Sequence, residues 1–187
     1  MKHLILALLI CLTSQSLFAL EGLSIGAKSP VSSVTTIEGK TLELTDKPSV
    51  LIFYRGSWCP YCRTQLVSIE KDLMKDFGSL GQYIAISVDK KMIAKKMRDK
   101  NKFSFHIVSD PTASLLKAFK IANKLKPELV KKYKASYKID VEADSGETHH
   151  LVAHPAVYIL SKGVVTYVDI HENYKDRTKN TEILAAL

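Results

Sequence analysis

Cysteine is scarce in this chain. Three cysteines occur in 187 residues, at positions 11, 59 and 62, and Cys11 lies in an N-terminal stretch that we expect to be removed. The remaining chain cannot be a scaffold held together by several disulfides. It also lacks a second Cys-x-x-Cys pair, which a four-ligand zinc site usually requires. The shortage leaves Cys59 and Cys62 as a single pair and favours a chemical role for them.

Long hydrophobic runs are missing too, apart from one short run near the start. Residues 4–12 are apolar and follow a basic beginning, but a membrane span needs about 20 apolar residues. A polar stretch and the small residue Ala19 complete the pattern of a signal peptide. We predict a signal peptide over 1–19, one domain over 20–187, and a periplasmic or secreted protein. An uncleaved membrane anchor is the alternative.

Acidic residues are fewer than basic ones, 19 against 27, which gives a net charge of +8. Lysines gather over 90–102 and 117–138. Such runs are typical of the solvated faces of amphipathic helices, although attraction to acidic proteins or an anionic membrane surface is another interpretation. No nucleic-acid-binding motif accompanies them, and export argues against such a partner.

The stretch WCPYC at 58–62 organises the rest of the chain. An apolar run at 50–54 comes before it, and apolar residues at helical spacing come after it, at positions 66, 69, 73 and 77. This pattern predicts a strand, a tight loop and a helix. Pro60 suits the first helical position. Cys59 is therefore expected at the N-cap, where free N–H groups and the helix dipole face its sulfur.

The same placement predicts the roles of the two thiols. The pKa of Cys59 should fall below the value of about 8.5 that a free thiol has. Cys62 lies one helical turn further in and can resolve a mixed disulfide. Arg55 is expected to stabilise the thiolate. Three neighbours are expected to shape access to the pair: Trp58, Pro60 and Tyr61.

Strand and helix patterns alternate along the rest of the chain. A hairpin is predicted over 34–44. Apolar runs predict strands at 49–54, 82–88 and 105–108. Amphipathic patterns predict helices at 60–78, 90–100 and 113–120. This alternation indicates an α/β domain with a parallel core sheet. A second hairpin over 156–160 and 164–170 and a helix over 181–187 close the chain.

The residues around the pair resemble a known superfamily. A strand, a WCxxC and a helix resemble thioredoxin, and the wider pattern resembles the peroxiredoxins of the alkyl hydroperoxide reductase/thiol-specific antioxidant superfamily. Those proteins read approximately F-Y-P-x-x-x-T-x-x-C-P-T-E-L around the peroxide-reacting cysteine. In that register Cys62 falls on the peroxidatic cysteine, Arg55 on a proline and Cys59 on a threonine. Two later segments match as well, VSDP at 108–111 and HPAVYI at 154–159. The match is closest to the peroxiredoxin-like group that carries a thioredoxin-type CxxC.

The resemblance implies a thioredoxin-like α/β fold with an N-terminal β-hairpin. It makes 122–150 an insertion, with a helix from Pro127 and a polar loop over 140–150, which either overhangs the cysteines or is a surface excursion. It also implies a cis bond at Pro155, where the preceding backbone would dock a partner. An ordinary trans proline at the start of a strand is the alternative. His154 stands where the family carries its active-site arginine.

Histidines at positions 149, 150, 154 and 171 raise the question of a metal site. Their spacing matches no recognised ligand pattern, so we expect solvated or locally hydrogen-bonded side chains. His154 is singled out because it precedes Pro155. Its imidazole could donate to a substrate or stabilise a thiolate, and its charge could change near neutral pH.

These observations favour an exported thiol–disulfide oxidoreductase in which Cys59 attacks and Cys62 resolves. No cofactor is needed, since the cysteines carry the electrons, and the partners would be protein thiols or disulfides that recycle the pair. The first alternative is a thiol-dependent peroxidase in which Cys62 reacts with peroxide and Cys59 resolves. The missing threonine and arginine predict slow peroxide turnover. The second alternative is a Cu(I)-binding module that uses the pair and His154.

Overall fold

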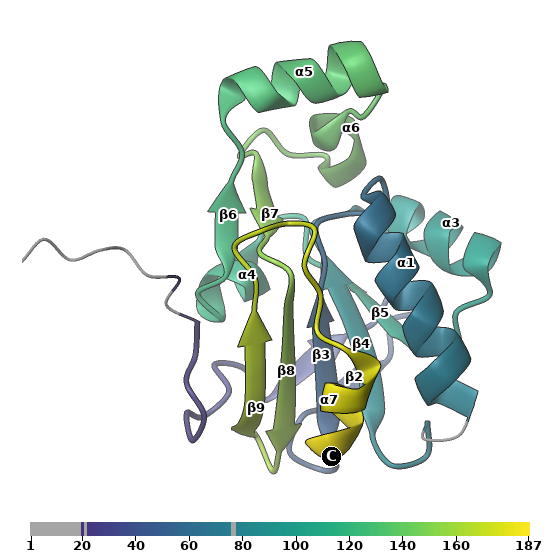
Figure 1. Cartoon of the computed structure of the whole chain (residues 1–187), viewed down its shortest axis with the longest axis vertical. Helices are drawn as coiled ribbons and strands as arrows, with labels where there is room; N and C mark the ends of the chain where they lie inside the picture. Colours follow the sequence, from purple (N-terminus) through teal and green to yellow (C-terminus); the bar gives the residue numbers. More distant parts are fainter. Residues whose placement is uncertain (1–19, 21, 76–77) are drawn as a thin grey trace, which may run out of the picture.

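The computed structural model describes residues 20, 22–75 and 78–187. The predicted signal peptide over 1–19 and the helical position of Phe77 lie outside these residues. Within them, the chain builds a five-stranded sheet with helices on both faces (Figure 1). No helix in this part of the chain is long and apolar enough to cross a bilayer.

The sheet has the strand order β5-β4-β3-β8-β9. Its strands are β3 (Ser49–Phe53), β4 (Gln82–Ser87), β5 (His106–Ser109), β8 (Ala156–Ser161) and β9 (Val164–Ile170). β3, β4 and β5 run parallel, whereas β8 and β9 are each antiparallel to the strand before them in the sheet. Every residue of β3 is buried. This confirms the prediction that a strand with two apolar faces is central.

The two faces of the sheet are covered differently. One face carries α1 (Pro60–Ile69), which continues as a π-helical stretch over Glu70–Met74, together with α3 (Lys91–Asn101) and α7 (Asn180–Ala185). The other face carries α4 and the N-terminal hairpin. Their bounds are Ser114–Ala118 for α4, Ser33–Thr35 for β1 and Thr41–Glu43 for β2. The predicted hairpin, sheet and helices are therefore confirmed, with bounds shifted by a few residues.

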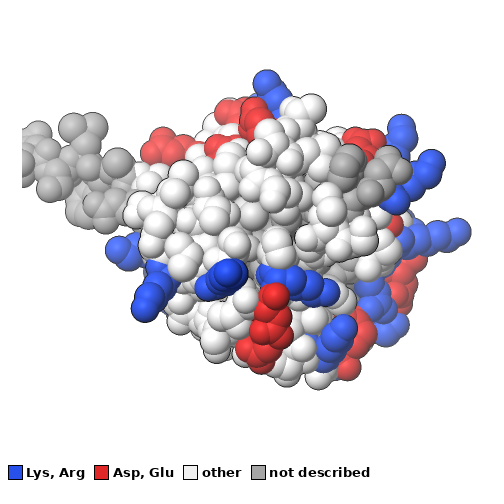
Figure 2. Space-filling view, turned by 90° about the horizontal axis from the view of Figure 1, so that it is seen from below, with Lys and Arg blue, Asp and Glu red and all other residues white. Residues whose placement is uncertain are grey.

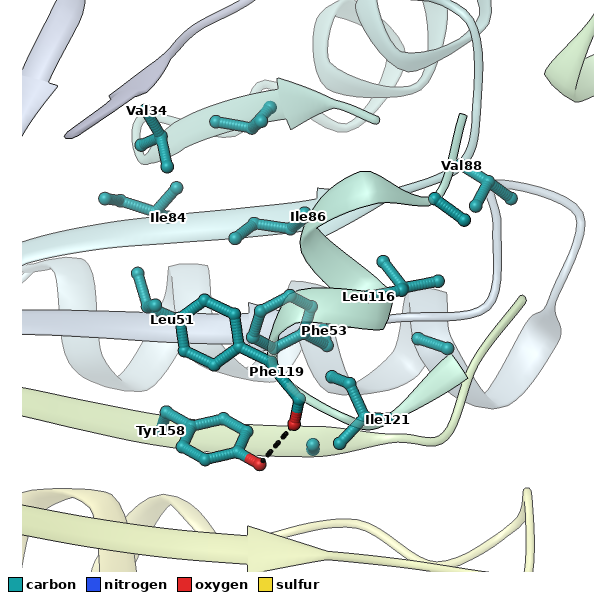
Figure 3. Close-up of a cluster of buried hydrophobic side chains, with 14 of the residues drawn as sticks. Val34, Leu51, Phe53, Ile84, Ile86, Val88, Leu116, Phe119, Ile121 and Tyr158 are labelled. Carbon is teal, nitrogen blue, oxygen red and sulfur yellow. Dashed lines mark hydrogen bonds between the residues drawn. The ribbon is translucent and has the colours of Figure 1, made fainter. Parts of the chain in front are cut away.

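The core under α4 shows how alternate residues of β3 separate the two faces. Figure 3 shows Leu51 and Phe53 pointing to the same side as Phe119 and Tyr158. The Phe53 and Phe119 rings lie 5.0 Å apart, and the Tyr158 hydroxyl donates to the carbonyl of Phe119 at 3.2 Å. That bond satisfies the polar end of a buried ring. The intervening residues of β3 pack against α1 instead.

The insertion is more ordered than the sequence predicts. It consists of β6 (Ala122–Lys124), α5 (Pro127–Tyr137) and α6 (Val141–Ser145), and β6 pairs with β7 (Leu151–Ala153). Figure 1 shows α5 and α6 above the edge of the sheet where β3 ends and α1 begins. The expectation of a helical insertion is confirmed, whereas no sequence pattern predicts β6 and β7.

The expected loop over 140–150 contains the one-turn helix α6, which corrects that expectation. The Asp140 carboxylate accepts from the backbone N–H of Ala143 at 3.1 Å. Gly146, with φ of 80°, ends the turn in the left-handed conformation that glycine adopts easily. Local capping therefore decides the structure of a segment that is polar and too short for a clear periodicity.

The peptide bond at Pro155 is trans, which corrects the expectation of a cis proline. No cis peptide bond occurs in the described residues. The backbone N–H of His154 donates to the carbonyl of Ile121 at 2.8 Å, and the carbonyl of Pro155 accepts from the N–H of His171 at 2.9 Å. These bonds extend the pairing of β6 with β7 and of β8 with β9. The backbone is thus held extended, and the His154 N–H is not free to dock a partner strand.

Charge is mixed rather than segregated at the end of the molecule opposite the insertion. Figure 2 views the molecule from that end and shows lysines and arginines interspersed with acidic residues around an uncharged centre. On α3, Lys95 pairs with Asp99 at 2.7 Å, and both side chains are exposed. Exposed, paired charges of this kind agree with a solvated helix face for the lysines of 90–102.

Candidate active site

The loop before the cysteine pair is tied to the end of β4. The backbone N–H and the hydroxyl of Ser57 both donate to the Asp89 carboxylate, at 2.8 and 2.6 Å. The Ser87 hydroxyl donates to the same oxygen at 2.9 Å. Asp89 is fully buried, and this burial raises the pKa of its carboxyl group. The bonds fix where the chain leaves β3 and turns towards α1.

Gly56 shows how tightly this loop is packed. A Cβ built at this position would lie 2.4 Å from Nε1 of the Trp58 indole. A side chain here would therefore displace the indole that forms one side of the site. The backbone N–H of Cys59 donates to the carbonyl of Gly56 at 3.0 Å and closes the turn.

Cys59 occupies the N-cap of α1, with Pro60 at the first helical position, as predicted. The backbone N–H of Cys62 donates to the Cys59 sulfur at 3.3 Å. The two cysteines are free thiols, with exposed fractions of 0% and 1%. A helix N-terminus with its orphan N–H group aimed at sulfur favours the thiolate.

A residue that the sequence does not identify lies beside both sulfurs. Nη2 of Arg177 is 3.1 Å from the Cys62 sulfur and 3.7 Å from the Cys59 sulfur. The guanidinium is held from behind, because its Nη1 donates to the carbonyls of Tyr174 and Asp176. Arg177 lies in the segment between β9 and α7, which crosses the front of the sheet in Figure 1. No motif marks this arginine, and 115 residues separate it from Cys62.

The two thiols have shifted pKa values of opposite sign. The pKa of Cys59 falls to about 6, mainly because the Cys62 thiol donates to its sulfur, with further help from the Cys62 N–H, Arg55 and Arg177. The pKa of Cys62 rises well above its ordinary value, because it is buried and lies beside the Cys59 sulfur. At neutral pH the pair therefore holds one thiolate, on Cys59, and one thiol, on Cys62.

Arg55 acts on the pair from a distance, inside a cage of aromatic rings. Its exposed fraction is 3%, and the guanidinium carbon lies 4.9 Å from the Trp58 ring and 4.7 Å from the Tyr174 ring. Nη2 donates to the Tyr133 hydroxyl at 3.0 Å. Aromatic faces attract a cation, so the cage joins the loop, the insertion and the C-terminal segment around one buried charge.

A groove with a volume of about 580 Å³ opens onto Cys59. We call it the insertion groove, because α5 and the end of β6 form one wall, and the loop and the C-terminal segment form the other. Trp58, Pro60 and Tyr61 line it, as expected for residues that shape access. The Trp58 and Tyr133 rings lie 5.4 Å apart. Of the two interpretations of the insertion, the one in which it overhangs the cysteines is therefore correct.

Two predicted site residues are not brought into the groove. His154 and Pro155 do not line it. Nδ1 of His154 lies 3.3 Å from the carbonyl of His171, and partial burial lowers the pKa of this imidazole. A contact of His154 with the sulfurs is absent from the hydrogen bonds of the described residues. Its position before β8 agrees with the sequence pattern, but its side chain points to β9.

Two of the other histidines are hydrogen-bonded locally. Nε2 of His149 lies 2.6 Å from the carbonyl of Pro111, and Nε2 of His150 lies 2.6 Å from the Glu142 carboxylate. Across residues 22–75 and 78–187, no three His, Cys, Asp or Glu side chains are grouped so that they could hold a metal ion. The two thiols could bind a Cu(I) ion, but His154, which the sequence suggests as a third ligand, does not lie beside them.

Comparison with known proteins agrees with this geometry. The model of the AhpC/TSA family matches residues 25–168. The chain belongs to the AhpC/TSA family. It is accordingly a peroxiredoxin-like oxidoreductase with a thioredoxin-like fold and thiol-based chemistry. No curated protein matches the sequence.

Solved structures support the fold at low sequence identity. Reduced Prx3 from Vibrio vulnificus in complex with hydrogen peroxide has a TM-score of 0.69 at 16% identity, covering 88% of this chain and 98% of that one. Peroxidoxin BcpB from Mycobacterium tuberculosis has a TM-score of 0.63 at 16% identity, covering 87% and 92%. AhpC from Enterococcus faecalis has a TM-score of 0.62 at 16% identity, covering 86% and 88%.

Proposed function

We propose that this protein reduces peroxides, with Cys59 as the attacking thiolate and Cys62 as the resolving thiol. The observation that supports this most is the position of Arg177, whose Nη2 lies 3.1 and 3.7 Å from the two sulfurs. The sequence predicts slow peroxide turnover because His154 stands where the family carries an arginine. Arg177 supplies a guanidinium from another part of the chain, so the lack of an arginine at position 154 no longer argues against peroxide reduction.

The proposed reaction uses the pair in two steps. The Cys59 thiolate attacks one peroxide oxygen, the O–O bond breaks, and the departing alkoxide or hydroxide takes a proton to leave as alcohol or water. Cys59 is now a sulfenic acid. The Cys62 thiol then attacks the Cys59 sulfur, which releases water and forms the Cys59–Cys62 disulfide. An external dithiol returns two electrons to the pair.

The assignment of the attacking role to Cys59 departs from the family register, which places Cys62 on the peroxidatic cysteine. Two features favour Cys59. Its pKa is lowered to about 6, whereas that of Cys62 is raised. Cys59 lines the insertion groove and Cys62 does not. Arg177 does not distinguish the two cysteines in favour of Cys59, since its Nη2 lies 3.1 Å from the Cys62 sulfur and 3.7 Å from the Cys59 sulfur.

Thiol–disulfide exchange with protein substrates is the second candidate. The N-capping position of Cys59 and its lowered pKa favour it, because exchange requires an accessible thiolate and a resolving thiol. The burial of both sulfurs counts against it, since a protein disulfide must approach Cys59 in line. A small peroxide needs less room.

We further propose that the protein is exported after cleavage near residue 19 and works in the periplasm or outside the cell. The support is the sequence pattern of 1–19 alone. In an oxidising compartment the disulfide accumulates unless a dithiol partner reduces it. An intact Met1 in the mass of the protein recovered from its native compartment would contradict cleavage.

Single-cysteine variants test the function and the roles together. In Cys62→Ser, peroxide should produce a stable Cys59 sulfenic acid that dimedone traps stoichiometrically. In Cys59→Ser, the same dose should leave Cys62 as a thiol, because burial, the largest cause of its raised pKa, remains in the variant. The reverse labelling would assign the attack to Cys62. Rapid reaction of the wild type with glutathione disulfide, together with no reaction with any peroxide, would establish the second candidate instead.

A further inference from the structure

The insertion groove combines an apolar wall with a basic rim. Its apolar surface comes from aliphatic and aromatic side chains of the insertion and of the loop before α1. These residues are Trp58, Leu125, Leu129, Tyr133, Tyr137 and Ile139. Tyr137 has an exposed fraction of 58% and presents a large ring to solvent. Apolar surface left open beside a reactive centre marks a binding site.

Three lysines form the rim: Lys124, Lys126 and Lys132. None of them takes part in an ion pair within the described residues, whereas Lys134 on the same helix is paired with Asp140 at 2.8 Å. Glu172 is the single acidic residue that lines the groove. The rim is therefore complementary to a negative group.

The floor of the groove offers a buried donor. Nε of Arg55 has no hydrogen-bond partner among the described residues, although the residue is almost fully buried and lines the groove. An unmade hydrogen bond at a buried donor is costly. An oxygen-bearing group that displaced the side chains covering Nε would satisfy it.

Size restricts the occupant further. A volume of about 580 Å³ suits a small molecule, and the Cys59 sulfur belongs to a residue with no exposed surface. A slender chain can approach that sulfur with a smaller displacement of the insertion than a folded protein surface would need.

From these features we infer that the insertion selects amphipathic hydroperoxides, in which an apolar chain carries both the peroxide and an acidic group. The inference rests on the proposed peroxide reduction. The chain lies against the apolar wall, the acidic group meets the lysine rim, and the peroxide is directed towards Cys59. The insertion thus recognises the substrate, whereas other residues take part in breaking the O–O bond.

A matched pair of substrates tests this directly. A long-chain fatty acid hydroperoxide and its methyl ester differ only in the negative charge. At low ionic strength and below micelle formation, the free acid should react about tenfold faster than the ester at limiting concentration. The preference should shrink as salt is added, because exposed charges are screened. Equal rates for acid and ester, with hydrogen peroxide still reduced, would overturn the selectivity and leave the proposed function standing.

A triple variant and a charge-matched control assign the preference to the rim. Lys124→Gln, Lys126→Gln and Lys132→Gln together should remove most of the tenfold preference for the acid and leave the rate with hydrogen peroxide unchanged. The control triple Lys71→Gln, Lys91→Gln and Lys131→Gln loses the same charge at exposed positions outside the groove and should keep the preference. Equal losses in both triples would attribute it to net charge and overturn the inference.

Binding can be measured without turnover, so that the two proposals fail separately. Trp58 is the only tryptophan in the chain, and it lines the groove, so its fluorescence reports occupancy. The parent fatty acid, which has no O–O bond, should shift this fluorescence and bind about tenfold tighter than its methyl ester. The absence of any effect of the acid would overturn the inference even if peroxides are reduced. Binding without reduction of any peroxide would overturn the proposed function and the substrate assignment, and would leave only a fatty acid site.

Discussion

Arg55 and Arg177 both lie beside the cysteine pair, but they come from different regions and act differently. Arg55 belongs to the loop that leads into α1 and is enclosed by aromatic rings, and its guanidinium makes no hydrogen bond to either sulfur among the described residues. Arg177 belongs to the C-terminal segment and lies in contact with both sulfurs. The residue near the motif supplies a background charge, whereas the distant residue lies close enough to both sulfurs to stabilise negative charge on either one.

The arginine that is nearer to the cysteines in sequence is therefore not the one whose side chain contacts their sulfurs. Arg55 is fixed by the Tyr133 hydroxyl and by two rings, so its guanidinium has little freedom to turn. Arg177 is anchored through Nη1 to carbonyls of its own segment, which leaves Nη2 directed at the sulfurs. A donor that is held in place before the reaction stabilises developing charge without reorganisation.

Replacing Arg177 tests the contrast between the two arginines most strongly. Arg177→Ala should lower the rate of reaction with peroxide by about 10²–10³-fold, the usual loss for one preorganised donor at a transition state. Arg177→Lys should restore part of it, because a lysine keeps the charge but not the fork of donors. Stopped-flow measurement of the Cys59 reaction checks this. Lys175→Ala, a change in the same segment that touches no sulfur, is the control. A loss below threefold in Arg177→Ala would favour disulfide exchange over peroxide reduction as the function.

The pH dependence of Cys59 should show the effect of the Cys62 thiol on its sulfur, with smaller contributions from both arginines. With a pKa of about 6, the rate of alkylation should be flat above pH 7 and fall about tenfold for each pH unit below 6. The lowered pKa also stabilises the reduced protein as the pH rises from about 6 to the unfolded value of about 8.5. Above that value the raised pKa of Cys62 has the opposite effect. A midpoint near 8.5 for Cys59 would contradict the assigned contacts.

The aromatic cage should contribute mainly to stability. Tyr133→Phe removes the hydroxyl that accepts from Arg55 and keeps the ring against Trp58. We expect a loss of about 1 kcal/mol in the free energy of unfolding, measured in urea, and less than a threefold change in rate. Tyr137→Phe is the matched control, since its hydroxyl takes no part in the hydrogen bonds of the described chain. A rate loss as large as that of Arg177→Ala would show that Arg55 takes part in the reaction with peroxide.

His154 should have the smallest effect. His154→Ala removes a ring that contacts the carbonyl of His171 and lies outside the insertion groove, so the rate should change less than twofold. Burial lowers the pKa of this imidazole, so its contribution to stability is present above about pH 6.5 and is lost as the pH falls below that value. The variant should therefore be less sensitive to acid. A tenfold loss of rate would restore the role that the sequence suggests.

Local sequence accounts for the parts of this protein that depend on neighbouring residues. The strand at 49–53, the N-cap at Cys59 and the helix from Pro60 follow from a local apolar pattern and a proline whose missing N–H costs nothing there. The alternation of strands and helices predicts the parallel core of the sheet, because parallel strands need a crossover between them. The lowered pKa of Cys59 follows from its place at the start of the same helix, one turn before Cys62.

Long-range packing, in contrast, sets which distant groups meet that helix. Arg177 reaches the sulfurs because the segment between β9 and α7 crosses the front of the sheet, and no local sequence pattern predicts that course of the chain. The insertion covers Cys59 because Tyr133 packs on Trp58 and bonds Arg55, contacts between segments far apart in the chain. Pro155 is trans, and the N–H of His154 before it is paired with the carbonyl of Ile121. Pairing between distant segments satisfies backbone groups that a motif leaves undetermined.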